Sequence, residues 1–263
     1  MAEISGKTKI LLICVIVSFI LLDTALSKYI LSGFGNTLIY DIEIENNDGN
    51  SYNARLYRPI KASSMNQRPA VLLAFENRLG KNSGDYVGSE LARRGFVVLS
   101  VADSSNQSSD VENGKQEENM IDAGYTYLST RSFTDHDRIG AAAWNNSVTK
   151  VLNSKNYSKF TSKIYLANKG NSDIEKSITP ESNVYYASGL DSLIFGKKTV
   201  SSINDIFHND LDLPDDNEFS EITGTYSVLL YTLRIFRVIL VISIFGVFLL
   251  PNRNQKSKMS SPE

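Results

Sequence analysis

The sequence predicts an α/β domain, built as a mostly parallel sheet with helices on both faces, between N- and C-terminal transmembrane helices. Two strand-like segments of alternating polarity come first in the domain, and continuous apolar segments then alternate with amphipathic ones. Long apolar runs lie near both ends of the 263-residue chain. With these ends set aside, roughly 190 residues remain, which suffices for one core but not comfortably for two.

Four segments follow from these patterns. They are an N-terminal signal anchor or signal peptide (residues 1–35), an α/β domain (36–222), a transmembrane helix (223–251) and a cytoplasmic tail (252–263).

The composition excludes several classes of site. The net charge is -2 and the basic residues are scattered among acids, so the sequence shows no nucleic-acid-binding face. The single cysteine, Cys14, lies in the first apolar run, and a disulfide or thiolate metal site needs more than one. His136 and His208 are the only histidines, which excludes a His-rich zinc site. We therefore expect no metal and no cofactor.

The first apolar segment admits two interpretations. Lys7 and Lys9 precede an uncharged run at residues 10–22, and residues 10–31 together reach the length of about 20 residues that spans a bilayer. However, the uncharged run alone is short, and residues 25–27 (Ala-Leu-Ser) resemble a signal-peptidase site. The segment is either a retained signal anchor or a cleaved signal peptide. Both direct the domain out of the cytoplasm.

The second apolar run, residues 226–250, is long enough to cross a membrane and ends at Pro251. Arg253 and Lys256 follow it, whereas residues 205–221 before it carry acids and no Lys or Arg. Because Lys and Arg favour the cytoplasmic side, we expect cytoplasmic termini and an extracytoplasmic domain at the cell membrane. The lipid bilayer is the expected partner, and the transmembrane helices could also bind another membrane protein.

Three charged residues interrupt these apolar segments: Asp23, Arg234 and Arg237. Arg237 lies 13 residues before Leu250 and Asp23 lies 13 residues after Ile10, so two spanning helices would hold them at similar depth. One hypothesis is an ion pair of Asp23 with Arg237 or Arg234 inside the bilayer. The alternative is that the arginines reach the outer headgroups while Asp23 meets only water.

The domain is expected to begin with a β-hairpin, because residues 37–45 and 51–58 alternate in polarity around a turn-forming Asn-Asp-Gly-Asn sequence. The later elements follow from apolar runs and caps. We expect strands at residues 70–75, 96–101, 138–143 (a short one), 163–167 and 183–188, and helices at 85–94, 115–130 and from Trp144 onward. In such sheets, ligands bind at the carboxyl ends of the strands.

Three ordered segments, residues 68–80, 89–103 and 135–140, resemble the α/β-hydrolase superfamily, in particular dienelactone-hydrolase-like proteins. The first is similar to the third strand and its oxyanion loop. The second is similar to the helix and strand that follow, and the third to the approach to the nucleophile strand. This resemblance implies a nucleophile elbow of sequence G-x-S-x-G.

The elbow differs from that pattern. The five matching residues, 143–147, read Ala-Trp-Asn-Asn-Ser, which puts Asn145 at the nucleophile position. An amide cannot be activated by proton removal in the way that serine is. Ser147 is the nearest hydroxyl, but its flanking position should point away from the site.

The resemblance also implies positions for the remaining site groups. Glu76 and Asn77 occupy the oxyanion loop, where a carboxylate would oppose the developing negative charge. Asp191 matches the triad acid, and His208 follows in the order expected of the base. His208 either shares a cleft with Asp191 or is a surface residue of an acidic linker.

The expected function is a membrane-anchored, catalytically inactive homologue that acts as an extracytoplasmic binding or assembly module, such as a subunit of a membrane complex. The alternative is an active serine-type hydrolase, esterase or peptidase-like, with a non-standard site. A third hypothesis is capture of a small ligand near Glu76, Asn77, Asn145 and Asp191.

Overall fold

The computed structural model describes residues 5–46, 49, 51–75, 87–102, 113–144, 147–168, 183–187, 197–213 and 224–249. The chain forms two compact units. One contains Ser32–Glu221, and the other contains Met1–Leu31 together with Ile222–Glu263.

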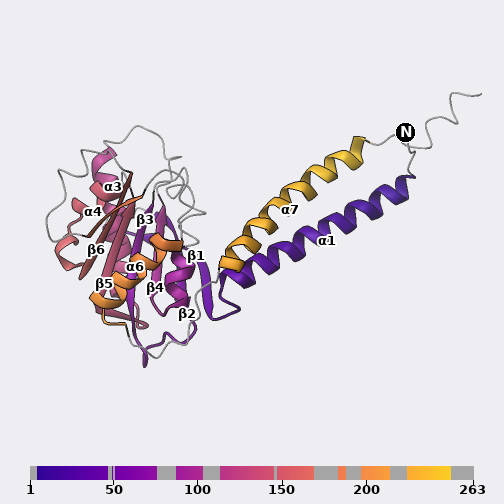
Figure 1. The fold of residues 1–263 in the computed structure, drawn as a ribbon. Helices are drawn as coiled ribbons and strands as arrows, with labels where there is room; N and C mark the ends of the chain where they lie inside the picture. The colour runs from indigo at the N-terminus through magenta and orange to yellow at the C-terminus, as the bar shows by residue number, and fades with distance from the viewer. Residues whose placement is uncertain are drawn as a thin grey trace, which may run out of the picture. The chain divides into compact units, whose positions relative to one another are not determined.

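The larger unit is built on a seven-stranded sheet of order β1-β2-β4-β3-β5-β6-β7 (Figure 1). Its strands are β1 (Thr37–Glu45), β2 (Ser51–Pro59), β3 (Arg68–Phe75), β4 (Val97–Ala102), β5 (Thr134–Trp144), β6 (Ser162–Asn168) and β7 (Asn183–Ala187). β2 pairs antiparallel with β1 and β4, and the remaining neighbours are parallel. The predicted mostly parallel sheet is therefore confirmed.

The first two strands form the predicted hairpin. They pair along their whole length, from Thr37 opposite Pro59 to Glu45 opposite Ser51. Gly49, in the connection, has a φ of 80°, a left-handed conformation that glycine adopts without steric cost.

Both faces of the sheet are covered by helices. All eight residues of β3 are buried, and those from Ala70 to Phe75 alternate between two apolar cores. One core joins Leu72 of β3 to α3 (Asn113–Ser129) and α4 (Ser147–Leu152). The other joins Leu73 to helical residues 87–93 and to α6 (Lys197–Asp210). The sequence of β3 is continuously apolar from Ala70 to Phe75 because helices cover both of its faces.

The central strand β5 differs from its prediction. It spans 11 residues rather than the short stretch 138–143, because it pairs with β3 from Thr134 onward, across an irregularity in register. Trp144 is the last residue of the strand and does not begin a helix. The next helix, α4, starts at Ser147.

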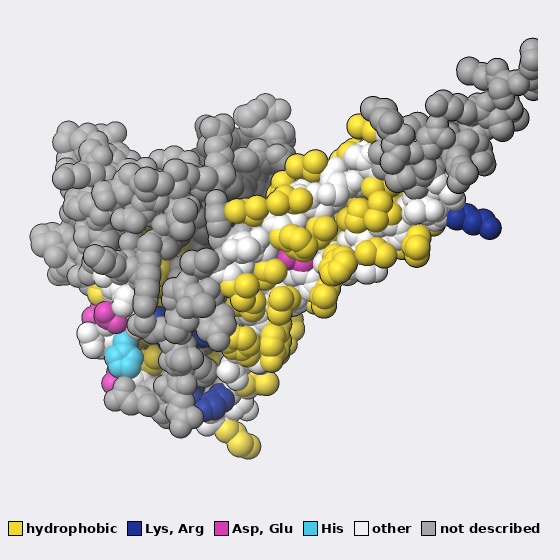
Figure 2. Space-filling model, turned by 45° about the vertical axis from the view of Figure 1, so that its right-hand side comes forward, with side chains coloured by type: hydrophobic (Ala, Val, Ile, Leu, Met, Phe, Trp, Pro, Cys, Tyr) yellow, Lys and Arg dark blue, Asp and Glu magenta, His cyan; other side chains and the backbone are white. Residues whose placement is uncertain are grey.

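The second unit contains α1 (Gly6–Leu31) and α7 (Gly224–Leu249), which pack side by side (Figure 1). Both are long and apolar enough to cross a membrane. Most of their large apolar side chains are exposed, and Figure 2 shows many of them along the side of the pair that faces the viewer. Their length and composition are compatible with membrane anchoring.

Gly140 in β5 permits a close approach of α6. A Cβ atom there would lie 2.6 Å from Cε1 of Phe207 and 3.2 Å from Cδ1 of Leu211. We predict that Gly140→Ala lowers the free energy of unfolding by about 1–3 kcal/mol, because the buried ring has to move. Denaturant titration of the full chain in detergent measures the change. Adding Phe207→Leu should recover part of the loss, and an unchanged stability in Gly140→Ala would contradict this packing.

Candidate functional site

The neighbouring parallel strands β4, β3 and β5 all end at the same edge of the sheet. Phe75 at the end of β3 lies opposite Ala102 at the end of β4, and Ala74 lies opposite Ala143 in β5. The resemblance assigns the site to this carboxyl edge. Of the expected site residues, Glu76 and Asn77 follow β3 directly in the chain and Asn145 follows β5. These three residues and Asp191 lie outside the described residues, so their ligand-binding and catalytic assignments stay predictions.

The strand-to-helix connection falls at the predicted elbow. β5 ends at Trp144 and α4 begins at Ser147, which leaves two residues between them. Ser147 is only 1% exposed, and its Oγ is buried. A nucleophile has to reach the substrate. This burial therefore disfavours Ser147 as a nucleophile. Its neighbour Val148 belongs to the core formed with α3.

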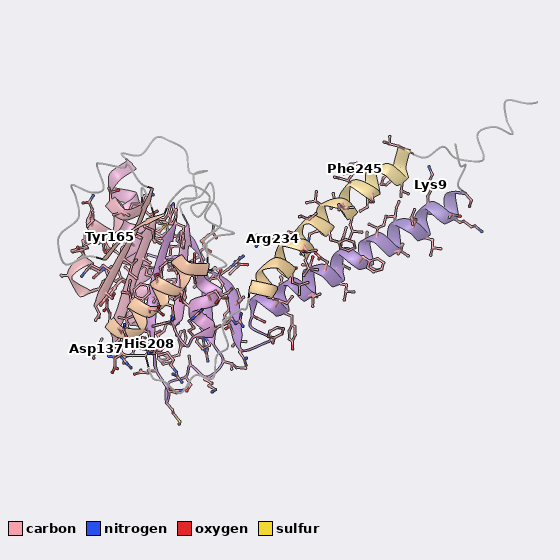
Figure 3. The ribbon with its side chains drawn as sticks, in the orientation of Figure 1. Lys9, Asp137, Tyr165, His208, Arg234 and Phe245 are labelled. Carbon is pink, nitrogen blue, oxygen red and sulfur yellow. The ribbon has the colours of Figure 1, made fainter. Side chains whose placement is uncertain are left out.

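His208 lies elsewhere, in the last turn of α6. The preceding residue, Phe207, packs over Gly140. Two residues after His208, Asp210 accepts a 2.6 Å hydrogen bond from the hydroxyl of Ser162, the first residue of β6. The end of α6 therefore lies at the amino ends of the parallel strands. In Figure 3, His208 and Asp137 occupy this same end of the domain.

The amino ends of the parallel strands lie far from the predicted elbow at residues 143–147. Gly140 precedes Trp144 by four residues, or roughly 13 Å at the usual rise of a strand. His136, the other histidine, precedes Trp144 by eight residues, roughly 26 Å. Both histidines of the chain are thus remote from the carboxyl edge. α6 carries His208 back along the sheet, which disfavours the prediction that His208 serves as the base beside Asn145.

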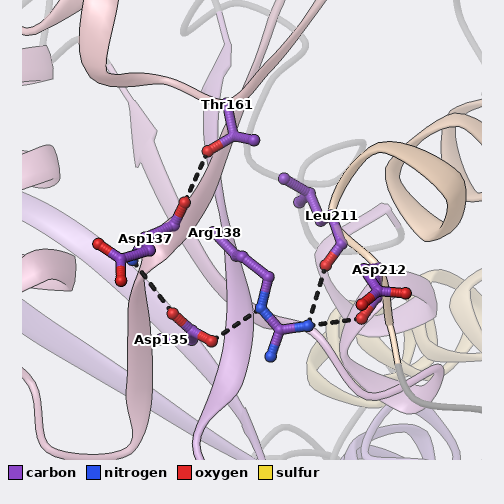
Figure 4. A network of polar contacts seen from close by, with 6 residues as sticks. All are labelled: Asp135, Asp137, Arg138, Thr161, Leu211 and Asp212. Carbon is purple, nitrogen blue, oxygen red and sulfur yellow. Dashed lines mark hydrogen bonds and ion pairs between the residues drawn. The ribbon is translucent and has the colours of Figure 1, made fainter.

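The amino edge contains a network of polar contacts instead (Figure 4). Arg138 in β5 donates to Asp135 Oδ2 over 2.7 Å and to the carbonyls of Leu211 and Asp212 over 3.3 and 2.5 Å. The other oxygen of Asp135 accepts from the backbone N–H of Asp137. Arg138 therefore satisfies the carbonyls of the two residues that follow α6. The helix itself ends because Asp212 adopts a left-handed φ of 47°, which lets the N–H of Leu213 donate back to the carbonyl of His208. The sequence of residues 135–140 indicated only the family resemblance, because the partners of Arg138 after α6 lie 73 and 74 residues away in the chain.

Tyr125 of α3 lies in the core that also contains Phe160, with the two rings edge to face at 5.2 Å. Burial raises the pKa of Tyr125 above its usual value of about 10, and the negative charge of Asp137 raises it further. This tyrosine is uncharged at neutral pH and stabilises the fold in that form.

The described residues contain no group of three or more His, Cys, Asp or Glu side chains that could hold a metal ion. The second unit does bring predicted charges together. Arg237 of α7 donates from Nε to Asp23 Oδ2 of α1 over 2.6 Å, while Arg234 is exposed.

Comparison with known proteins gives the fold. No family model and no curated protein matches the chain. Among solved structures, dienelactone hydrolase from Anabaena variabilis matches 68% of this chain over 100% of its own length, with 10% identity and a TM-score of 0.51. The larger unit has an α/β-hydrolase fold. At this identity the similarity concerns the fold of the domain and leaves its activity open.

Other solved structures match with lower TM-scores. The esterase Est22 matches 68% of this chain over 60% of its own length, with 12% identity and a TM-score of 0.43. The chain spans less than half of several other matched structures. It covers 43% of the hypothetical protein PA2218 from Pseudomonas aeruginosa, at 17% identity and a TM-score of 0.42.

The role of Arg138 can be tested by Arg138→Met, which keeps the aliphatic stem but removes the charged donors. We predict a loss of about 1–2 kcal/mol in the free energy of unfolding, since the bonds are charge-assisted but partly exposed. Chemical denaturation measures it. Arg131→Met is the matched control, because exposed Arg131 rests on the ring of Tyr127. Equal effects of both substitutions would contradict the network's role.

The raised pKa of Tyr125 should make the free energy of unfolding depend on pH in the alkaline range. Its pKa is higher in the folded state, so its stabilising contribution is complete below the unfolded value of about 10 and is lost as the pH rises towards the folded value. Tyr125→Phe should therefore lose less stability than the parent chain between about pH 9 and 11. Denaturation curves across this range measure the difference, and parallel losses in both chains would refute the assignment.

Proposed function

We propose that this protein is a membrane-anchored, catalytically inactive hydrolase-fold protein whose domain acts as an extracytoplasmic binding or assembly module. The position of the histidines carries the argument. A serine-type hydrolase needs a base within hydrogen-bond reach of its nucleophile, and histidine fills this role in the hydrolase triad. His136 and His208 both lie near the amino edge of the sheet, on the wrong side for that task.

The residues around the elbow support the same proposal. The sequence has Asn145 at the nucleophile position. The nearest hydroxyl, that of Ser147, is buried in the domain interior. An active hydrolase would thus need both a different nucleophile and a different base. The fold retains the scaffold on which ligands bind in related architectures, so binding without turnover is the function that these residues support best.

The anchoring part of the proposal rests on α1 and α7. Their exposed surfaces are apolar along most of their length, which favours contact with a bilayer or with another membrane protein. Lys7 and Lys9 precede the apolar part of α1, and Arg253 follows that of α7. This distribution supports cytoplasmic termini and a domain on the outer side. A subunit of a membrane complex would use the domain, the helices or both for assembly.

Inactivity can be tested with a fluorophosphonate probe, which labels activated serines, and with p-nitrophenyl acetate as a general ester. We predict neither specific labelling nor hydrolysis by the purified full chain. Asn145→Ser should remain inactive as well, because a new hydroxyl at the elbow would find no histidine. Labelling that disappears in Ser147→Ala would support an active hydrolase instead.

The informative control is the double variant Asn145→Ser/His208→Ala. If Asn145→Ser hydrolysed the ester and the double variant did not, His208 would be acting as a base at the elbow. That result would overturn both the proposal and the position of α6.

A further inference from the structure

The buried sides of α1 and α7 follow a regular spacing. Among the side chains that the structure describes in these helices, the buried and half-buried ones other than Thr24 and Ser243 recur at alternating intervals of three and four. On α1 they are Lys9, Ile13, Ile16, Ile20, Asp23, Ser27 and Ile30, and on α7 they are Leu233, Arg237, Leu240, Ile244 and Val247. This is the seam of a two-stranded coiled coil. The two helices pack as a hairpin along it.

One layer of this seam is polar. Asp23 has a side chain only 3% exposed, and its Oδ2 accepts a 2.6 Å bond from Arg237 Nε. Nη2 of the same arginine approaches Ser27 Oγ at 3.1 Å. We call these three residues the polar lock. The second oxygen of Asp23 is buried and has no hydrogen-bond partner among the described residues, so this carboxylate depends heavily on Arg237.

Three other hydroxyls of the described helices bond within their own helix. Ser18, Thr24 and Ser243 each donate to the carbonyl four residues earlier. They are satisfied without the neighbouring helix and specify no pairing. The polar lock differs, because its groups come from both helices.

The polar lock also sets the register. With Asp23 opposite Arg237 in an antiparallel pair, the uncharged residues 10–22 of α1 lie level with the uncharged residues 238–250. Each run has 13 residues, or roughly 20 Å of helix. The hydrocarbon core of a bilayer is about 30 Å thick. If residues 10 and 250 lie at one surface of this core, the polar lock lies roughly 20 Å deeper and is therefore still inside the core. Sliding one helix by a heptad would oppose Asp23 to Ile244 or Leu230, which cannot pair with a carboxylate.

We infer that the polar lock is an intramembrane recognition site, which joins α1 to α7 in a fixed register and keeps α1 in the mature protein. The inference rests on the proposed membrane location. Ser27 belongs both to the polar lock and to the possible cleavage site at residues 25–27. Cleavage after Ser27 would free the segment that holds Asp23 from the domain, and departure of that segment would leave Arg237 unpaired in the bilayer, at a cost of a few kcal/mol.

Disulfide crosslinking in isolated membranes tests the pairing. In a Cys14→Ser background, Ile16→Cys with Ile244→Cys places two thiols at the same level of the seam. We expect an intramolecular crosslink. Val15→Cys with Phe245→Cys is the matched control, because this pair has the same register but both side chains are exposed. Equal crosslinking of the two pairs would overturn the inferred seam.

Substitution of the arginines tests the polar lock itself. Arg237→Leu should reduce seam crosslinking by about tenfold, the scale expected of a polar contact between membrane helices. Arg234→Leu is the control, since Arg234 lies on the same helix but is exposed outside the polar lock. The exchange Asp23→Arg with Arg237→Asp should restore crosslinking. An unchanged yield in Arg237→Leu would overturn the recognition site.

Two further measurements separate this inference from the proposed function. The mass of the purified chain should include α1, and a mature protein that begins at Lys28 would overturn retention. Fractionation should recover the chain with the membranes. Recovery in the soluble fraction would refute the membrane location itself, whereas a membrane-bound chain without seam crosslinks would refute only the hairpin.

Discussion

The burial of β3 on both faces is the constraint on which the domain depends. Its residues from Ala70 to Phe75 alternate between two apolar cores, so neither face of the strand meets water there. Helices must therefore cover both sides of the sheet, and the chain has to cross over between parallel strands. The crossovers bring β4 and β5 to either side of β3 and align their carboxyl ends. The edge at which a ligand site can form is a consequence of this arrangement.

In the same arrangement, several charged groups and both histidines lie towards the amino edge of the sheet, away from its carboxyl edge. At the amino edge, Arg138 neutralises Asp135 and satisfies carbonyls after α6, so its charges are committed to structure. Both histidines lie towards this edge. The carboxyl edge keeps the geometry of a hydrolase scaffold but has no histidine within reach. The packing of the domain and the chemistry of a site at its carboxyl edge thus depend on different residues.

The pair formed by α1 and α7 holds a charged carboxylate among apolar side chains. A buried carboxylate is costly unless it is paired, and Arg237 supplies both the charge and a second donor directed at Ser27. Apolar layers of a seam tolerate sliding, whereas an ion pair opposes it. Our inference joins these facts: one polar layer specifies the register, and the isoleucines on either side supply the contact area.

The sequence by itself determined the elements whose signals are local. The alternation in residues 37–45 and the apolar run in 70–75 identified strands, because periodicity reflects which side chains a strand buries. The ordered segments after them indicated the hydrolase fold. Tertiary structure alone decided the length of β5, which depends on its pairing with β3, and the location of His208, which depends on how α6 returns along the sheet. It also selected Arg237 over Arg234 as the partner of Asp23, since only Arg237 faces the seam. These features arise from contacts between residues far apart in the chain, and local patterns carry no record of such contacts.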